Sequence, residues 1–553
     1  MPLLEQVQQA LSHSVLIDGG SALFTWYVFK KLEIVNAYVA PILLLLLPVG
    51  LSVLTIDMFH PFLSFARTFG IYYVFLGGYI LTYRLSPMHP LAGYPGPLLA
   101  KVSKIWIVFH GRDGNQHRVI QDLHRTYGDV VRIGPNELSF ANAFAIMPLM
   151  GTTGAAKGPN WQGRTLFAPI PSLVSLRDNA IHARRRKPWS RAMSTSALKE
   201  YQIVIAQRSA QFVETLLDQK GQVDLSERIS FYTWDFMSDM AFGGGSEMMR
   251  DGDVDGYWKL LEDGLSLAFL LDHLPWIGYY IRNIPGVGED LKRMRAMGIE
   301  RATVRANAGS HSKDLFYYLS NEDGADKVSP PRPTIISDGI LAIIAGSDTT
   351  SSILSIAFYH LLLLPEVYEK LQSEIDTYYP EGEDTFDTKH HSKMSYLDAV
   401  LNETLRMYPV IPSGSQRTFT EGEGGRMIGP YFVPNHTQVR VPNYTLHHDP
   451  RYFHPNPDTF WPERWLIAEG LIRKPEVPFI HDMNAFIPFS FGPANCVGKN
   501  LAMLEMKMLL CHSIQKLRFR FADGFDPTGW ENGLKDYFTL RRAKLPVVVE
   551  SRA

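Results

Sequence analysis

Long apolar runs mark the N-terminal part of the chain. No charged residue occurs between Ile34 and Ile56, whose middle reads PILLLLLPVG, and a second apolar run covers Thr68–Tyr83. A weaker run, Val15–Phe29, is interrupted by Asp18. A helix needs about 20 apolar residues to cross a bilayer. The pattern therefore predicts a membrane anchor over residues 1–88 with two or three transmembrane segments.

Charged residues around these runs indicate an orientation. The positive-inside rule places the basic clusters in the cytosol and the loop near Asp57–Arg67 in the lumen. The basic residues concerned are Lys30, Lys31, Arg84, Lys101 and Lys104. Because the first residues, MPLLEQVQQ, carry no positive charge, we expect no cleavable signal peptide. The alternative is a single hydrophobic hairpin that dips into the membrane without crossing it.

After a Pro-rich linker at residues 89–97, HPLAGYPGP, helical periodicity dominates. It predicts helices at Asn115–Tyr127, Asp224–Phe242, Gly339–Leu364, Met394–Tyr408 and Lys499–Leu517. Short strands are predicted at Val130–Arg132, Tyr431–Val433, Gln438–Val441 and Leu545–Val549, the last at a sheet edge because it contains Pro546. Residues 98–553 are therefore expected to form one large, mainly helical domain with small β-sheets.

Composition narrows the class of protein. Of the 553 residues, 46% are hydrophobic and 20% are charged, which is typical of a globular chain. The formal net charge is −2, so there is no basic excess that would favour nucleic acid. The chain has two cysteines, Cys496 and Cys511. This count excludes a disulfide-stapled scaffold and zinc clusters built mainly from thiolates.

Cys496 lies in a segment where glycines and a proline precede a predicted helix. This segment, FSFGPANCVGKNLAMLEMKMLL, begins at Phe489. Gly492 and Pro493 interrupt regular structure, Cys496 follows in a loop, and Gly498 precedes an amphipathic helix. The positive end of a helix favours thiolate over thiol, and glycines let the backbone approach a flat ligand. A solitary thiolate presented in this way suits an axial bond to haem iron. On residue type alone, an ordinary buried cysteine is the alternative.

The spacing FxxGxxxCxG at Phe489–Gly498 resembles the haem-binding signature of the cytochrome P450 superfamily. Three further motifs precede it in the chain, in the family's order: AGSDTT at Ala345–Thr350, ExxR at Glu403–Arg406 and PERW at Pro462–Trp465. The resemblance covers about Pro95 to Arg552 and is strongest to fungal microsomal members. It implies the cytochrome P450 fold and a haem b whose iron is bound by the cysteine of the signature.

The resemblance also implies roles for other residues. Thr349 would support the hydrogen bonding that activates oxygen, and Asp348 would relay protons. The alternative for such polar residues inside a helix is hydroxyls bonded to the helix's own carbonyls. Glu403, Arg406 and Arg464 would form an ion-paired structural clamp behind the haem-binding loop.

One departure from the family concerns the haem propionates. The family usually has Arg or His two residues before the cysteine, where this chain has Ala494. Other cations must neutralise the carboxylates, since buried unpaired charge is costly. The resemblance implies Arg417, His182 and Arg186 for this task. The remaining cations of the run Arg184–Lys187 are equally consistent with a solvated basic face and with a docking surface for an acidic redox partner.

The substrate pocket is expected between several apolar and aromatic segments. By resemblance these are Gly151–Leu176, Leu265–Ile284, the start of the AGSDTT helix, Val410–Ser413 and Tyr537–Thr539. Such a lining fits a lipophilic substrate and fits equally a surface pressed into a membrane.

Together these features predict a haem-thiolate monooxygenase on the endoplasmic reticulum membrane, with its catalytic domain facing the cytosol. It would insert one oxygen atom from O2 into a lipophilic small molecule in fungal secondary metabolism or xenobiotic oxidation. Too few residues follow Cys496 for a fused flavoprotein, so NADPH–cytochrome reductase is the expected partner, with cytochrome b5 as a further candidate electron donor. Two alternatives stay open, a haem-thiolate isomerase or dehydratase that needs no reductase and a non-catalytic membrane haem protein. The intact Asp348–Thr349 pair argues against the first.

Overall fold

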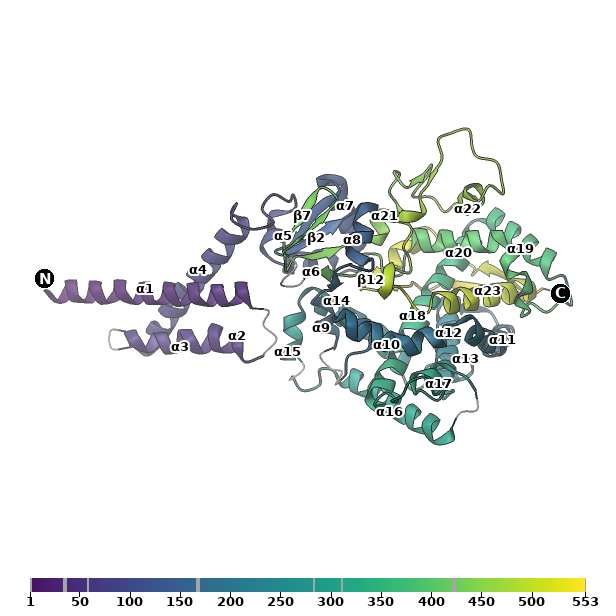
Figure 1. The fold of residues 1–553 in the computed structure, drawn as a ribbon, viewed down its shortest axis with the longest axis horizontal. Helices are drawn as coiled ribbons and strands as arrows, with labels where there is room; N and C mark the ends of the chain where they lie inside the picture. The colour runs from purple at the N-terminus through teal and green to yellow at the C-terminus, as the bar shows by residue number, and fades with distance from the viewer. Residues whose placement is uncertain are drawn as a thin grey trace.

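The structure, a computed structural model, describes residues 2–32, 37–56, 59–165, 170–281, 284–309, 312–419 and 424–552. An N-terminal extension of helices projects from a larger body, and the two chain ends lie at opposite ends of the long axis (Figure 1). The body is mainly helical and carries small sheets, as the sequence predicts.

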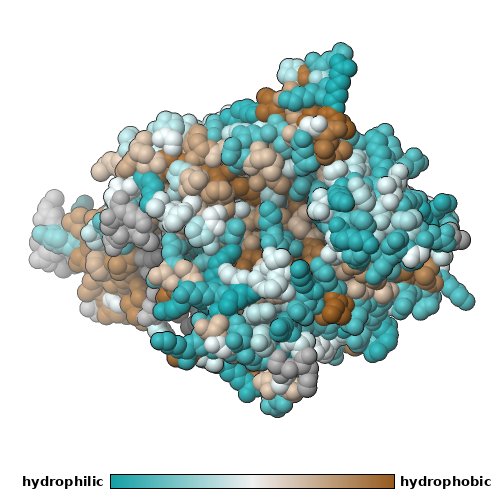
Figure 2. Space-filling model, turned by 45° about the vertical axis from the view of Figure 1, so that its right-hand side comes forward, coloured by the Kyte–Doolittle hydropathy of each residue, from teal (hydrophilic) through white to brown (hydrophobic). Residues whose placement is uncertain are grey.

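Three helical segments of the extension pack against one another. They are α1 (Pro2–Lys31), α4 (Pro61–Leu85), and a middle run that joins α2 (Val39–Pro41), a π-helical turn (Ile42–Leu46), α3 (Leu47–Ser52) and a 3-10 turn (Val53–Thr55). The buried Tyr72 hydroxyl of α4 lies 2.6 Å from Thr25 Oγ1 and 2.8 Å from the Leu43 carbonyl oxygen. One side chain thus connects all three segments. Apolar side chains face outward, so the extension is largely brown at the left of Figure 2.

The structure gives limited support to the predicted membrane crossings. Among the described helices, only α18 (Arg332–Leu363) is long and apolar enough to span a bilayer, and 67% of its apolar window is buried inside the body, as in a core helix. The run Val39–Thr55 is apolar but shorter, and α1 and α4 do not meet the same criterion. Residues 34–36 of the predicted middle segment lie outside the described residues. The crossings therefore stay a prediction.

A five-stranded sheet with strand order β1-β2-β8-β5-β3 lies at the end of the body nearest the extension. Its strands are β1 (Val130–Gly134), β2 (Glu137–Phe140), β3 (Ala156–Lys157), β5 (Arg417–Thr418) and β8 (Gln438–Arg440). Strands β2 and β8 are parallel, and the other neighbours are antiparallel. The pairing of β3 with β5 brings two segments far apart in the sequence side by side.

Four smaller sheets complete the described β-structure. They comprise β11 (Leu517–Phe521), β14 (Pro546–Ser551) and β4 (Gln222–Asp224); β6 (Arg426–Ile428) and β7 (Tyr431–Val433); β9 (Phe453–His454) and β10 (Ile480–His481); and β12 (Lys535–Asp536) and β13 (Leu540–Arg541). The predicted edge position of the last strand is wrong, because β14 is central between β11 and β4. Pro546 is tolerated there because it is the first residue of the strand, where its missing N–H interrupts no ladder.

The remaining helices form the body around α18. They are α5 (Leu98–Val102), α6 (Ile105–Gly111), α7 (Gln116–Tyr127), α8 (Ile146–Met150), α9 (Asn160–Thr165), α10 (Asn179–Ala192), α11 (Thr195–Leu217), α12 (Leu225–Phe242), α13 (Met248–Asp251), α14 (Tyr257–His273), α15 (Gly278–Ile281), α16 (Glu289–Ala308), α17 (Leu315–Leu319), α19 (Pro365–Tyr378), α20 (Ser395–Met407), α21 (Asn443–His447), α22 (Glu463–Ala468) and α23 (Lys499–Lys516). The five helices predicted from periodicity are confirmed as α7, α12, α18, α20 and α23.

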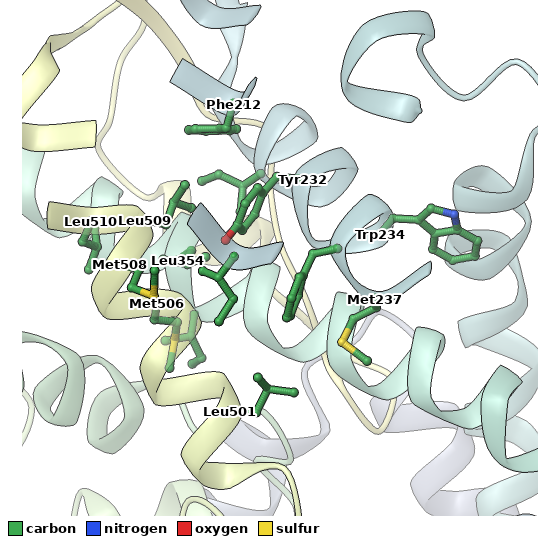
Figure 3. Packing of buried hydrophobic residues seen from close by; sticks show 14 of the residues in the cluster. Phe212, Tyr232, Trp234, Met237, Leu354, Leu501, Met506, Met508, Leu509 and Leu510 are labelled. Atoms are coloured by element: carbon green, nitrogen blue, oxygen red, sulfur yellow. The ribbon is translucent and has the colours of Figure 1, made fainter. Parts of the chain in front are cut away.

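The largest hydrophobic core gathers residues of α12, α18 and α23 (Figure 3). Tyr232 of α12, Leu354 of α18 and Leu501 of α23 are all buried in it. A helix that is apolar on every side belongs inside a large protein, which explains why α18 runs through the middle of the body. The same core therefore fixes both the helix that carries Asp348 and the helix that begins just after Cys496.

Candidate functional site

The loop that carries Cys496 has a tightly defined backbone. The Cys496 N–H donates to the Phe489 carbonyl at 2.9 Å, so the segment between them turns back on itself. Gly492 has φ of +71°, and a Cβ at this position would lie 1.9 Å from the Met150 carbonyl oxygen of α8. No side chain fits there. Gly498 has an ordinary backbone conformation, and a Cβ on it would come within 4.0 Å only of Cys496 Sγ. Glycine at this position keeps the space beside the sulfur open.

The Cys496 thiol experiences opposing electrostatic effects. The side chain is accessible to solvent, but the protein around it desolvates the sulfur, and this burial raises the pKa of the thiol above its usual value. The N–H groups of Gly498 and Lys499, in the first turn of α23, and the charge of Arg186 work in the opposite direction. The predicted preference for thiolate at the helix terminus is thus present, but desolvation outweighs it. A bound metal ion would supply the missing charge, since coordination deprotonates a thiol.

Thr349 and Asp348 lie on different sides of α18. Thr349 is partly exposed, and its hydroxyl donates to the Ala345 carbonyl at 2.7 Å. This is the bond to the helix's own backbone that the sequence left as an alternative, and α18 is continuous from Arg332 to Leu363. Asp348 is buried instead, and burial raises the pKa of its carboxyl group.

Asp348 belongs to a buried ionic group that the sequence motifs do not reveal. Arg542 Nη1 lies 3.5 Å from Asp348 Oδ1, and the charge of Arg542 opposes the rise in the pKa of Asp348. The same guanidinium lies 3.2 Å from Glu262 of α14 and donates to the Ser230 hydroxyl at 2.8 Å. Because the Glu262 side chain is partly exposed, this group extends from the middle of α18 towards solvent.

Four cationic or basic side chains converge from three elements. His182 and Arg186 lie on α10, whose start is capped by Asp178 accepting from the Ile181 N–H at 2.8 Å. Arg417 lies on β5, directly opposite Lys157 on β3. Burial, and then the charges of Lys157, Arg186 and Arg417, lower the pKa of His182 to about 4.

These basic groups have few anionic partners. Arg186 donates to the carbonyl and the side-chain oxygen of Asn495 at 2.6 and 2.7 Å, which are neutral acceptors. Arg417 is almost fully buried, and its Nε has no hydrogen-bond partner among the described residues. Burial lowers the pKa of Arg417 to about 10. A buried guanidinium with an orphaned donor needs an anion, so the cluster fits a ligand that carries carboxylates, such as haem.

The rest of the basic run on α10 is divided between two roles. Arg185 pairs with the buried Asp338 of α18 through contacts of 2.9 and 3.0 Å. The predicted solvated face is therefore wrong for Arg185, because its charge is used to join α10 to α18. Arg184 and Lys187 are exposed, as that prediction requires.

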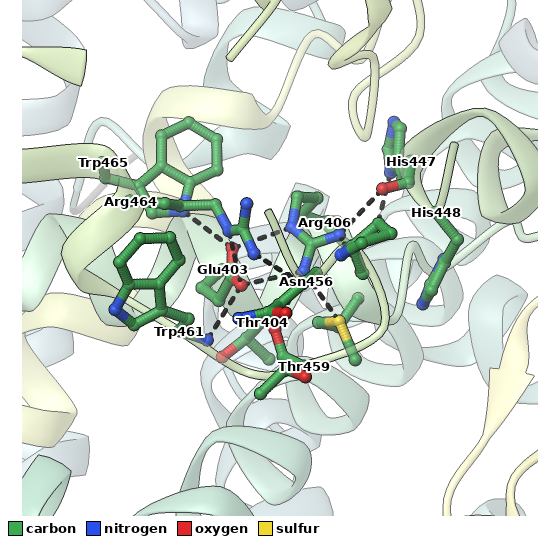
Figure 4. A network of polar contacts seen from close by, with 12 residues as sticks. Glu403, Thr404, Arg406, His447, His448, Asn456, Thr459, Trp461, Arg464 and Trp465 are labelled. Carbon is green, nitrogen blue, oxygen red and sulfur yellow. Dashed lines mark hydrogen bonds and ion pairs between the residues drawn. The ribbon is translucent and has the colours of Figure 1, made fainter. Parts of the chain in front are cut away.

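The structure brings Glu403, Arg406 and Arg464 together in a fully buried cluster (Figure 4). Arg406 donates twice to the Glu403 carboxylate at 2.8 Å, and Arg464 Nε donates at 3.0 Å. Trp461 N–H and Trp465 Nε1 add two bonds of 3.0 Å. Burial alone would raise the pKa of Glu403, but the charges of Arg406 and Arg464 hold it below its usual value.

This cluster is connected to the cysteine loop through one histidine. Arg406 donates to the His447 carbonyl at 2.8 Å, and the His447 ring accepts from the Ile487 N–H at 3.1 Å. The Ile487 carbonyl in turn accepts from the Ser490 N–H at 2.9 Å, inside the loop. The ion-paired cluster therefore supports the backbone that presents Cys496.

Three of the predicted pocket segments meet in the structure. Phe269, Ile411 and Phe538 line a small cavity of about 10 Å³ together with polar residues that include Asp272 and Arg440. Residues 166–169 and 282–283 of the predicted walls lie outside the described residues.

Comparison with known proteins agrees with the motifs. The family described as Cytochrome P450 matches residues 95–537. "Cytochrome P450 monooxygenase FCK2" of Fusarium pseudograminearum (strain CS3096) is 36% identical over 478 residues, which cover 86% of this chain and 84% of the relative. "Cytochrome P450 monooxygenase orf5" of Eupenicillium brefeldianum is 32% identical over 87% of this chain and 95% of the relative. "Tryprostatin B 6-hydroxylase" of Aspergillus fumigatus is 28% identical over 87% of this chain and 84% of the relative.

The buried cluster around Glu403 gives the first testable prediction. Glu403→Gln removes one charge without changing shape and leaves Arg406 and Arg464 buried without an anion. Breaking a buried ion pair in this way should lower the free energy of unfolding by about 3–5 kcal/mol, measured by urea denaturation in detergent. The matched control is Glu289→Gln, which removes an exposed ion pair with the same three-residue spacing, to Lys292, and should change little. Equal effects of the two substitutions would contradict the structural role.

Proposed function

This chain belongs to the cytochrome P450 family, and we propose that it inserts one oxygen atom from O2 into a lipophilic small molecule through a haem held by Cys496. It is a fungal-type cytochrome P450 monooxygenase, an oxidoreductase whose cofactor is a haem bound through a cysteine. The observation that carries the assignment to Cys496 is its position, at the start of α23 in a loop that excludes side chains at Gly492. The haem supplies the oxygen chemistry when bound.

The chain's own residues hold the cofactor. Cys496 would provide the thiolate that holds the haem iron, and Phe489, Gly492 and Gly498 would shape the loop around it. Arg417, His182 and Arg186 would bind the propionates. The orphaned Nε of Arg417 supports this assignment, as does the pairing of Arg186 with an uncharged asparagine, which a carboxylate can replace.

Thr349 and Asp348 would hold and move the protons that the reaction consumes. The Thr349 hydroxyl is partly exposed and can exchange its bond to the Ala345 carbonyl for a bond to substrate oxygen or water. Asp348 receives protons from solvent along the ionic group formed with Arg542 and Glu262. The raised pKa of Asp348 suits such a relay, because a group that is easily protonated can pass a proton on.

The N-terminal extension and the names of the relatives support the following setting for the enzyme. Electrons come from NADPH through a separate NADPH–cytochrome reductase, with cytochrome b5 as a second candidate donor. The exposed apolar surface of α1, α3 and α4 supports attachment to the endoplasmic reticulum membrane with the body in the cytosol. One relative is named as a hydroxylase of tryprostatin B, which supports a lipophilic substrate in fungal secondary metabolism.

The axial ligand is tested by replacing each cysteine in turn. Cys496→Ser should lose the carbon monoxide spectrum that is typical of haem thiolates, because the charge and softness of the sulfur set that spectrum. Cys511→Ser should keep it, since Cys511 is a buried core residue of α23. If the Cys496→Ser protein keeps the thiolate spectrum, the ligand assignment is wrong.

Propionate binding is tested at Arg417. Arg417→Leu should weaken haem retention because a buried carboxylate loses a charge-assisted hydrogen bond worth roughly 1.5–3 kcal/mol. Arg184→Leu, at an exposed arginine of α10, is the control. Ala494→Arg should leave retention unchanged or improve it. The measurement is haem content after extensive dilution, and full occupancy of the Arg417→Leu protein would count against the proposed anchoring.

Oxygen activation is tested by the ratio of product formed to NADPH consumed, with reductase and a substrate found by an unbiased metabolite screen. Thr349→Ala removes the hydroxyl, while alanine favours the helix, so the fold should survive. The ratio should fall and hydrogen peroxide should appear instead of product. Asp348→Asn should slow oxygen consumption as a whole, because proton supply is impaired.

Thr350→Ala serves as the control for this experiment, since Thr350 is buried and has no proposed role in proton delivery. If Thr349→Ala leaves the ratio of product to NADPH unchanged, Thr349 has no role in proton delivery. If the wild-type protein is active without any reductase, the proposed monooxygenase function is wrong and an isomerase or dehydratase function is favoured.

A further inference from the structure

Two buried basic residues stand directly opposite each other on neighbouring strands. Lys157 of β3 and Arg417 of β5 are cross-strand partners in the antiparallel pair. Only 6% of Lys157 and 4% of Arg417 are exposed. Like charges at directly opposed positions destabilise a sheet, and burial strengthens the effect because the surroundings screen it less. The pair therefore requires an explanation.

The acceptors around Lys157 are neutral. Its ammonium group donates to the Val174 carbonyl at 2.6 Å and lies 3.4 Å from the Leu173 carbonyl. Trp161 offers a ring face, with the ammonium 5.5 Å from its centroid. The described elements packed around Lys157 therefore supply dipoles and a ring, but no charged partner to its ammonium group.

The charged groups that face Lys157 from these elements are mainly cationic. Arg417 lies on β5 and Arg186 on α10, and both act on Lys157, while His182 lies beside them. The carboxylate of Asp338, on α18, is already paired with Arg185 and with the Leu173 N–H.

Burial and these neighbouring cations shift the pKa of Lys157 strongly. Burial first, and then the charges of Arg417 and Arg186, lower the pKa of Lys157 to about 7. Without an added anion, Lys157 is therefore only partly protonated at neutral pH. Arg417 and Arg186, by contrast, stay charged, since guanidinium groups keep their protons.

We propose that Lys157 binds a haem propionate together with Arg417, replaces the cation that the family usually carries at position 494, and takes up a proton when haem binds. The inference rests on the proposed haem site. It adds Lys157 to the residues that bind the propionates, and it adds the uptake of one proton when haem binds. A dianionic ligand would convert three mutually repelling groups, Lys157, Arg417 and Arg186, into counter-ions of two carboxylates. Ala494 is then tolerated because the replacement cation comes from β3 instead of the cysteine loop.

The proton linkage has a defined sign. Two carboxylates beside Lys157 raise its pKa above the value of about 7 in the free protein. Its contribution to haem affinity is therefore fully present below pH 7 and is lost as the pH rises through the higher pKa of the bound form. The Cys496 thiol would release its proton when it binds the iron, and this release would act in the opposite sense. In the haem-free protein the pKa of His182 is about 4, so His182 is neutral there between pH 6 and pH 9. Because Lys157→Met keeps His182, comparison of this variant with wild type isolates the contribution of the lysine.

The experiment measures the rate of haem transfer from the detergent-solubilised holoprotein to apomyoglobin between pH 6 and pH 9. The proteins are wild type, Lys157→Met, Lys157→Arg and, as a control, Lys187→Met at an exposed lysine of α10. Because one charge-assisted hydrogen bond is lost, Lys157→Met should release haem about tenfold faster than wild type near pH 6.5. The difference should shrink as the pH rises towards 9. Lys157→Arg should retain haem and remove this part of the pH dependence, while Lys187→Met should match wild type.

A second measurement uses the haem-free proteins. At pH 6, where Lys157 is mostly charged, Lys157→Met removes one of two opposed buried cations, so its urea unfolding midpoint should equal or exceed that of wild type. A substitution that merely damages packing would lower this midpoint. Opposite effects on the haem-free and haem-bound proteins would therefore support the proposal.

The proposal for Lys157 is overturned if Lys157→Met and wild type release haem at the same rate across the pH range. It is also overturned if the rate difference does not depend on pH. In both cases the thiolate spectrum of the wild type and its loss in Cys496→Ser would leave the proposed function intact. Absence of the thiolate spectrum from wild type would instead refute the haem site itself, whatever Lys157 does.

Discussion

A single buried carboxylate, that of Glu403, holds together the parts of the chain on which the cysteine loop rests. Five N–H donors from Arg406, Arg464, Trp461 and Trp465 converge on it. Two guanidinium groups and one carboxylate leave a net positive charge among fully buried side chains, and carbonyl oxygens such as that of His447 accept hydrogen bonds from the remaining donors. Such a group is costly to assemble and more costly to break, because any missing member leaves a charge unpaired.

The cofactor side of the site shows the reverse arrangement. Lys157, Arg417 and Arg186 accumulate positive charge without a carboxylate among them, and the cost appears as the lowered pKa of Lys157 and the orphaned Nε of Arg417. In the cluster around Glu403, by contrast, both guanidinium groups contact the carboxylate within the protein. Among the described residues the cation cluster has no anionic partner, and the anionic groups of a bound ligand would supply one.

The central helix α18 places two neighbouring polar side chains on different sides. Asp348 faces the buried group of Arg542 and Glu262, while Thr349 is partly exposed and uses its hydroxyl on Ala345. Consecutive residues of a helix point in directions about 100° apart, so two neighbours can serve a proton source and a reaction site that lie on different sides. Apolar packing against α12 and α23 fixes the rotation of α18 and thereby decides which of the two residues faces which side.

The sequence alone determined the fold class, the long helices and the family, because apolar periodicity and the spacing of Phe489, Gly492, Cys496 and Gly498 are local properties of the chain. It also indicated that Glu403 and Arg406 face each other, since three residues of helix bring them together. It could not place Lys157 opposite Arg417 or Arg542 beside Asp348, because these pairs come from distant segments and belong to no motif. The edge position predicted for β14 failed for the same reason, since strand order depends on which partners arrive from elsewhere. Only the tertiary structure decided which charges are paired and which are left to a ligand, because burial and neighbours, not residue type, set the cost of a charge.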